Sequence, residues 1–134
     1  MALFSVTLPV IAILDEKLFV GHAVGHIDRT GSIELLSVLK PKVRCTGRFR
    51  YTSLQTGVAD MRCDDGVAAT LAFDALGVFS GHGHGSTPKG PASFTFGLDY
   101  KEAARHLTLP DGTRLAETLE GLRLQSAGSS EGSR

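Results

Sequence analysis

The fold of this chain is decided by the stretch CTGRFRYTSLQTGVADMRC, residues 45–63, which contains both of its cysteines. If the chain turns back at Leu54, residues at equal distances from Leu54 face each other, and Cys45 lies opposite Cys63. Directly opposed residues of an antiparallel pair lie about 4.5–5.5 Å apart at Cα, which a disulfide can bridge. The stretch therefore predicts a β-hairpin with a disulfide between Cys45 and Cys63.

The two faces of this hairpin differ in character, as expected when one face packs on a core. The register places Phe49 opposite Ala59 on the face of the cysteines, and Arg48 opposite Asp60 on the other face. A turn signal, Asp-Asp-Gly at 64–66, leads into a third strand with the same alternation. This strand presents to the core face Val67, Ala69, Leu71, Phe73 and Ala75.

Further runs with the composition of strands lie on both sides of this three-stranded meander. Residues 18–28 and 32–38 are rich in Val, Ile and Leu and form a predicted hairpin. The alternating run SFTFGL predicts a strand over 93–98. Its expected hairpin partner is 78–84, across a loop over 85–91. Glycines at alternate positions of that partner indicate a bend or a close approach of backbone.

The first fourteen residues are mainly apolar, and they fit either an atypical export segment or the first strand of the fold. The run is too short to cross a bilayer as a helix, so no transmembrane helix is expected. It also lacks the basic residues and the small-residue cleavage site of a signal peptide. We therefore favour the strand.

The C-terminal part of the chain has a different pattern. Asp99 followed by Glu102 is typical of a helix start, and it predicts a short helix that continues to residue 106. Three leucines recur at helical spacing in 115–123, which predicts a final amphipathic helix. Residues 126–134 are small and polar and are expected to form a disordered tail. The ordered part is then a single β-rich domain over 1–125.

Composition narrows the class of protein. Fourteen basic and fourteen acidic side chains cancel, so no net charge attracts the chain to nucleic acid, and none is expected as a partner. No nucleophile or phosphate-binding motif is present, so we assign no catalytic residue and favour a non-enzymatic protein. The predicted fold is all-β, a curled antiparallel meander or a small barrel or sandwich, with a short helical C-terminal appendage.

Two histidine-bearing segments, GHAVGH and GHGHG, suggest a metal site. Because side chains alternate along a strand, His22 and His26 share one face, as do His82 and His84. If the two strands were neighbours, the four imidazoles could together bind zinc, copper or nickel. The alternative, which we favour, is that these histidines are solvent-facing side chains on glycine-rich strands.

The cysteines also admit other interpretations, as zinc ligands or as a redox couple. Neither cysteine has the short spacing of those sites, so the cross-strand disulfide is favoured. A disulfide between Cys45 and Cys63 indicates an oxidising compartment, the periplasm or the cell envelope, whereas a reduced pair indicates the cytoplasm. The weak export signal at the N-terminus favours the cytoplasm, so the two observations disagree.

The order of these motifs resembles that of a known group of proteins. CTGRFRY, the segment from Gly57 to Gly66, SGHGHG and SFTFG are similar to the C-x-G, C-x-D-G, S-G-x-G-x-G and F-x-F-G motifs of small uncharacterised bacterial proteins, many of them envelope-associated or secreted. The resemblance covers roughly residues 18–110 and implies an envelope-associated β-protein. We therefore expect a non-enzymatic bacterial accessory module that binds a protein partner or a small ligand, with metal binding as the alternative.

Overall fold

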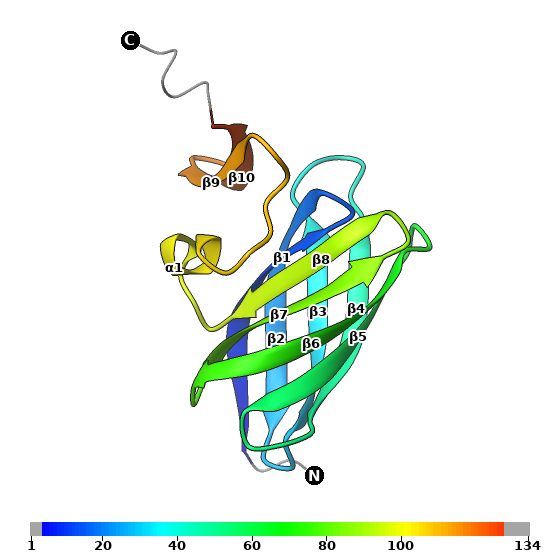
Figure 1. Ribbon diagram of the computed structural model, residues 1–134, viewed down its shortest axis with the longest axis vertical. Coiled ribbons are helices and arrows are strands. Elements are labelled where there is room, and N and C mark those ends of the chain that lie inside the picture. Colours follow the sequence, from blue (N-terminus) through cyan, green and yellow to red (C-terminus); the bar gives the residue numbers. More distant parts are fainter. Residues whose placement is uncertain (1–3, 128–134) are drawn as a thin grey trace.

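The computed structural model describes residues 4–127, and within them eight antiparallel strands close into a barrel (Figure 1). Each strand pairs with the next along the chain, and β8 pairs with β1 to close the sheet. The barrel strands are β1 (Ser5–Leu14), β2 (Lys17–His26), β3 (Thr30–Ser37), β4 (Arg44–Tyr51), β5 (Thr56–Cys63), β6 (Ala68–Gly77), β7 (Ser80–Thr87) and β8 (Gly90–Phe96). The all-β prediction is confirmed, and the curled meander closes completely into a barrel.

The hairpin over residues 45–63 has the predicted register. Cys45 pairs with Cys63 and Phe49 with Ala59 across β4 and β5, and the disulfide is formed. The next hairpin continues the pattern, since Met61 pairs with Ala69 across β5 and β6. Local alternation of apolar residues was sufficient to set this register because a slip of one residue would turn every core side chain outward.

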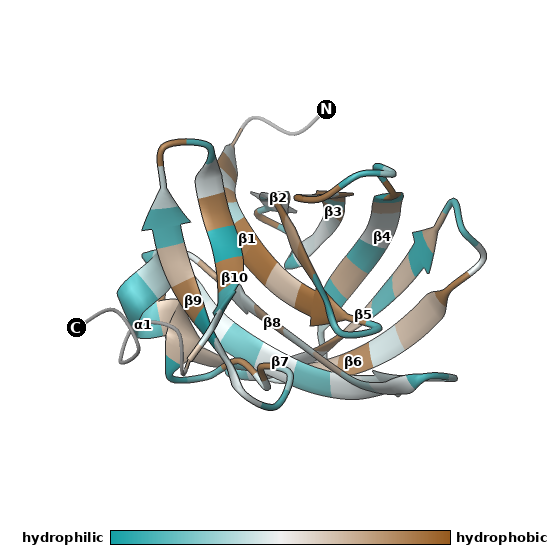
Figure 2. Cartoon of the chain, turned by 90° about the horizontal axis from the view of Figure 1, so that it is seen from above, coloured by the Kyte–Doolittle hydropathy of each residue, from teal (hydrophilic) through white to brown (hydrophobic). Residues whose placement is uncertain are grey.

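Strand β1 explains the apolar run at the N-terminus. Its second half, Val10–Leu14, is buried without interruption, and β1 is brown along much of its length in Figure 2. One face of the strand lines the barrel interior, and the other face is covered from outside by the C-terminal part of the chain. A strand buried on both faces reads as a continuous apolar run rather than as an alternating one.

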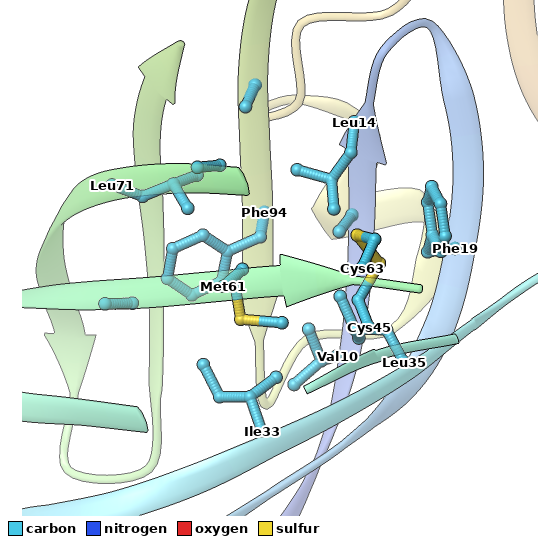
Figure 3. Close-up of a cluster of buried hydrophobic side chains, with 14 of the residues drawn as sticks. Val10, Leu14, Phe19, Ile33, Leu35, Cys45, Met61, Cys63, Leu71 and Phe94 are labelled. Atoms are coloured by element: carbon cyan, nitrogen blue, oxygen red, sulfur yellow. A yellow bond between two sulfur atoms is a disulfide. The ribbon is translucent and has the colours of Figure 1, made fainter. Parts of the chain in front are cut away.

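Aliphatic and aromatic side chains pack in the interior of the barrel (Figure 3). Glycines on β7 face this interior, and a Cβ added at Gly81 or Gly83 would overlap the ring of Phe96 or Phe94. The glycines of the GHGHG motif are therefore required by packing inside the barrel, because their lack of a side chain leaves room for these two rings. The interior of an eight-stranded barrel is narrow, with room for its own side chains or for one small ligand, so small residues have to face large ones wherever it is packed.

A second apolar cluster lies outside the barrel, between β1 and the C-terminal appendage. The appendage consists of α1 (Tyr100–Ala104) and a hairpin of β9 (Thr113–Thr118) and β10 (Gly121–Ser126), seen beside the barrel in Figure 1. Asp99 caps α1 as predicted, since its carboxylate accepts a hydrogen bond from the Glu102 backbone N–H at 2.9 Å.

The predicted helix over 115–123 is wrong, because this segment forms the β9–β10 hairpin. Leu115 pairs with Leu124 in the hairpin and packs towards the barrel, whereas Leu119 is fully exposed in the turn. Gly121, with φ of 109°, allows the chain to reverse. Leucines spaced for a helix face can thus equally belong to a strand and its turn, and burial against β1 selects the hairpin.

The predicted partner of β8 is shifted. The loop expected over 85–91 is in fact a short turn between Thr87 and Gly90, and β7 runs to Thr87. His84 therefore pairs with Ser93. The glycine-rich sequence of β7 has no apolar side chains to fix a register, so the rings of β8 and β6 fix it instead.

The boundaries of the predicted domain and tail are only partly visible. Ser126, the first residue of the predicted tail, is the last residue of β10. The remainder of that prediction, from residue 128 onward, lies outside the described residues, as do residues 1–3.

Candidate ligand-binding cavity

A cavity of about 410 Å³ lies at the end of the barrel where β1 begins, the lower end in Figure 1. It is bounded by the inner faces of the strands and by the β2–β3 and β6–β7 loops. Its lining is predominantly apolar and aromatic. The lining residues are Phe4, Ser5, Val6, Leu8, Val10, Ala23, Gly25, His26, Ile27, Arg29, Ile33, Phe49, Tyr51, Phe73, Val78, Phe79, Phe94 and Phe96.

Five aromatic rings of this lining contact one another. Phe73 is at their centre and makes edge-to-face contacts with Phe49, Tyr51 and Phe96, with ring centres 5.1–6.1 Å apart. Phe94 stacks beside Phe96 at 6.1 Å. Edge-to-face pairs of this kind stabilise one another beyond the burial of their area, so this wall of the cavity is well ordered before any ligand arrives.

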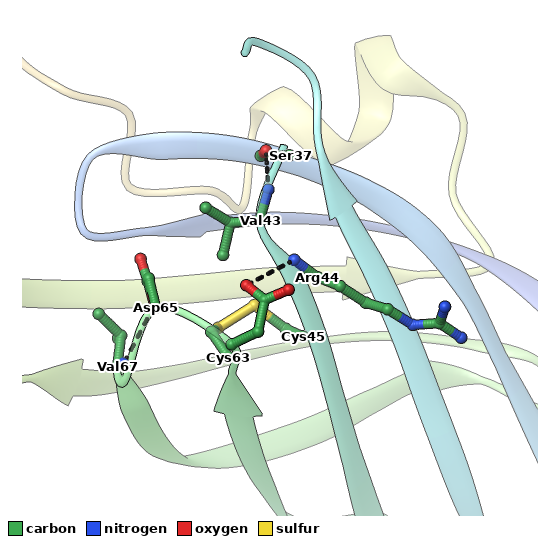
Figure 4. The surroundings of a disulfide bond; sticks show 8 residues. Ser37, Val43, Arg44, Cys45, Cys63, Asp65 and Val67 are labelled. Atoms are coloured by element: carbon green, nitrogen blue, oxygen red, sulfur yellow. Dashed lines mark hydrogen bonds between the residues drawn. A yellow bond between two sulfur atoms is a disulfide. The ribbon is translucent and has the colours of Figure 1, made fainter. Parts of the chain in front are cut away.

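The opposite end of the barrel carries the disulfide. The disulfide lies inside the barrel, at the start of β4 and the end of β5, with Cys45 fully buried (Figure 4). Beside it, the Asp64 carboxylate accepts a hydrogen bond from the Arg44 backbone N–H at 3.2 Å, and the Asp65 carboxylate accepts one from the Val67 backbone N–H at 3.1 Å. The Asp-Asp-Gly turn thus ties the β5–β6 loop to the start of β4.

The polar groups of the cavity are few and gather at its mouth. Ser5, His26, Arg29 and Tyr51 all belong to strand ends or to the β2–β3 loop. Arg29 is the one cation among the described lining residues, and none of them is a carboxylate. A mainly apolar cavity with a small number of polar groups at one place is the usual design of a small-molecule site.

Exposed apolar side chains surround this mouth and form a rim. Ile27 is 75% exposed, Leu54 85% and Val78 84%, and they come from three different loops at the same end of the barrel. The exposed members of the rim are Phe4, Ile27, Leu54, Leu76, Val78 and Phe79. Exposed apolar patches of this kind are typical of surfaces that contact proteins, membranes or ligands.

The four histidines predicted as metal ligands do not converge. β2 carries His22 and His26, β7 carries His82 and His84, and the premise that these strands are neighbours is wrong because β1 and β8 lie between them. His22 is exposed beside Glu34, with 3.8 Å between Nε2 and Oε1. Within residues 4–127, no three His, Cys, Asp or Glu side chains are grouped so as to hold a metal ion.

The histidines of β7 instead meet a histidine of the appendage. His82 stacks on His106 with ring centres 4.6 Å apart, and His84 lies 5.4 Å from His82. The Nε2 atom of His84 is 3.1 Å from the His106 carbonyl oxygen. Burial lowers the pKa of His82, and the positive charges of His106 and His84 lower it further, although Asp74 opposes the shift.

This arrangement predicts that acid destabilises the protein. His82 has a pKa below its ordinary value of 6.5 in the fold, whereas the unfolded chain takes up a proton near 6.5. Stability is therefore lost as the pH falls below about 6.5. His82→Gln should reduce the fall in Tm between about pH 7.5 and pH 5.5, while His22→Gln, at an exposed site, should not. An equal effect of both variants on the Tm difference would contradict the assignment to His82.

Sequence reasoning missed the cavity and its mouth. Phe49, Phe73, Phe94 and Phe96 were predicted to face a core, but nothing in their spacing indicated that the core is left open at one end. Arg29 lies between the segments 18–28 and 32–38 of a predicted hairpin, and nothing in the sequence indicated that its side chain would line a cavity.

Comparison with protein family models, with curated proteins and with solved structures found no match. The class of protein is therefore defined by its architecture, a closed eight-stranded antiparallel barrel with an aromatic-lined cavity at one end. No helix among residues 4–127 is long and apolar enough to cross a membrane.

Proposed function

We propose that this protein is a non-enzymatic binding module that takes up a small, mainly apolar molecule in the barrel cavity. The observation that supports this function is the cavity itself, about 410 Å³ in volume and walled by aromatic rings. Small-molecule sites typically have volumes of about 300–1,000 Å³ and bury most of the ligand against apolar and aromatic side chains.

The rim supports the same function. A ligand that is sparingly soluble in water must reach the cavity from another protein or from a lipid phase, and exposed apolar side chains such as Ile27 and Val78 favour that contact. The disulfide supports a place of action in an oxidising compartment, for which we propose the bacterial periplasm or cell envelope. The protein would then hold or transfer its ligand outside the cytoplasm.

Filling the cavity should abolish binding without unfolding the barrel. Gly25 lines the cavity, and a Cβ added there would make only ordinary contacts, 3.6 Å from Phe49 Cζ and 3.7 Å from Val6 Cγ1. The larger side chain of Gly25→Leu must extend into the cavity and occupy space that a ligand needs. We expect it to weaken binding of the uncharged fluorescent probe N-phenyl-1-naphthylamine by about tenfold or more, measured by fluorescence titration.

Gly25→Ala is the matched control, because a single methyl group leaves most of the cavity open. It should bind the probe nearly as well as the unmodified protein does, and both variants should give the same far-UV circular dichroism. If Gly25→Leu is folded and still binds the probe with unchanged affinity, the probe lies elsewhere and the proposed site is wrong. If the unmodified protein binds no apolar probe, the proposed function itself is wrong.

A further inference from the structure

We infer that the ligand is an amphiphile with an anionic head, which Arg29 binds at the mouth of the cavity while the apolar body lies among the aromatic rings. This inference rests on the proposed function and adds the chemical class of the ligand. It is carried by the position of Arg29 at the mouth and by the absence of an acidic partner for its guanidinium group among residues 4–127.

Arg29 is held at the mouth by contacts with the neighbouring β4–β5 loop. Its Nη2 atom donates hydrogen bonds to the carbonyl oxygens of Ser53, at 3.1 Å, and Leu54, at 2.8 Å. Its guanidinium carbon lies 4.2 Å from the centre of the Tyr51 ring. These contacts fix the direction of the side chain, so the guanidinium is already in place before a ligand binds.

The charge of Arg29 has no acidic partner. Among residues 4–127, no carboxylate lies within 4.0 Å of its guanidinium, although Asp28 is its neighbour in the chain. The Asp28 carboxylate instead accepts hydrogen bonds from the backbone N–H of Thr30, at 3.1 Å, and from its hydroxyl, at 2.7 Å. A guanidinium has five N–H donors, and Nη2 supplies both of the bonds to the β4–β5 loop. The donors of Nε and Nη1 remain available for an anion.

The backbone at Arg29 is also unusual for an arginine. Its φ of 68° lies in the left-handed region, which favours glycine or asparagine at the end of a three-residue hairpin loop. The turn sets this conformation, and it directs the Arg29 side chain to the mouth of the cavity.

The rest of the lining favours an apolar body for the same ligand. Beneath the mouth the cavity is walled by rings such as Phe73 and Phe96 and offers no cation or carboxylate. A molecule charged along its length would lose its hydration there without compensation. A ligand with an alkyl or aromatic body can pack that body against the aromatic wall while its single terminal anionic group binds Arg29 at the mouth.

A pair of ligands that differ only in the head group tests the inference. Dodecanoate and dodecan-1-ol, each below the concentration at which it aggregates, compete with bound N-phenyl-1-naphthylamine, and the loss of probe fluorescence gives each affinity. We expect the unmodified protein to prefer dodecanoate by about tenfold, the range of one charge-assisted contact. The carboxylate is the better hydrated of the two, so such a preference requires a specific partner in the site.

Arg29→Gln should weaken dodecanoate binding by about tenfold or more and change dodecan-1-ol binding less than about twofold. Arg50→Gln is the matched control, because the substitution removes the same charge at the same end of the barrel. Arg50 pairs with Thr30 across β3 and β4 and does not line the cavity. It should leave both affinities nearly unchanged.

Equal losses in the two arginine variants would overturn the inference, since they would indicate attraction by the general field of the protein. Equal affinities of the unmodified protein for the acid and the alcohol would also overturn it and leave the proposed function intact; this comparison holds even if Arg29→Gln does not fold. Failure of the probe and of both competitors to bind would overturn the proposed function as well.

Discussion

Gly21→Ala is expected to lower the free energy of unfolding by about 3 kcal/mol, the upper end of what overpacking usually costs. A Cβ at this position would overlap the carbonyl oxygen of Glu34 and lie 2.9 Å from the Cα of Leu35. Both are backbone atoms of the paired strand β3, which cannot move aside as a flexible side chain can. The added methyl group therefore has to displace β3 or break the pairing of β2 with it.

The control for this prediction lies four residues further along the same strand. Gly25 faces the same side as Gly21, but a Cβ there makes only ordinary contacts. Gly25→Ala should change the free energy of unfolding by less than about 1 kcal/mol, since it adds no overlap and restricts the unfolded chain slightly. Urea unfolding of both variants, followed by circular dichroism, compares them directly. Equal losses would show that strand crowding at Gly21 is not the cause.

Reduction of the disulfide is expected to lower the free energy of unfolding by about 3 kcal/mol. The bridge closes a loop between residues 18 apart, so its loss gives the unfolded chain more freedom. Cys45 is also completely buried within the interior cluster, and the disulfide links β4 to β5 there. The protein would be markedly less stable in a reducing compartment than in an oxidising one.

Urea unfolding with and without dithiothreitol measures this difference. The double variant Cys45→Ala/Cys63→Ala provides the control, because its stability should not depend on the reductant and should be close to that of the reduced protein. If the unmodified protein unfolds at the same urea concentration in both conditions, the disulfide contributes nothing and the argument for an oxidising compartment loses its support.

The local β-architecture was predictable because it depends on contacts between residues near each other in sequence. In a hairpin, alternation of apolar residues and the length of the turn together fix which side chains face the core, and a slip of one residue reverses all of them. The pairings of Cys45 with Cys63 and of Met61 with Ala69 follow from this rule. The capping of α1 by Asp99 is equally local.

Elements whose side chains carry little information were predicted less well. β7 has glycine at every interior position from 81 to 85, so its register depends on the rings that fill the space. The C-terminal leucines fit a helix by their spacing, but the segment forms a hairpin because its Leu115 packs against the outer face of β1. In both cases contacts distant in sequence outweigh the local pattern.

The amino-acid order alone was enough to establish an all-β chain, the central meander and its disulfide, since each follows from pairings within a hairpin. Closure of β8 onto β1 joins segments about 80 residues apart, and no local signal encodes it. That closure encloses the cavity and brings the aromatic wall under the loop that carries Arg29. A cavity is the space that side chains from many strands leave unfilled, so the candidate site becomes visible only when all of the strands are in place.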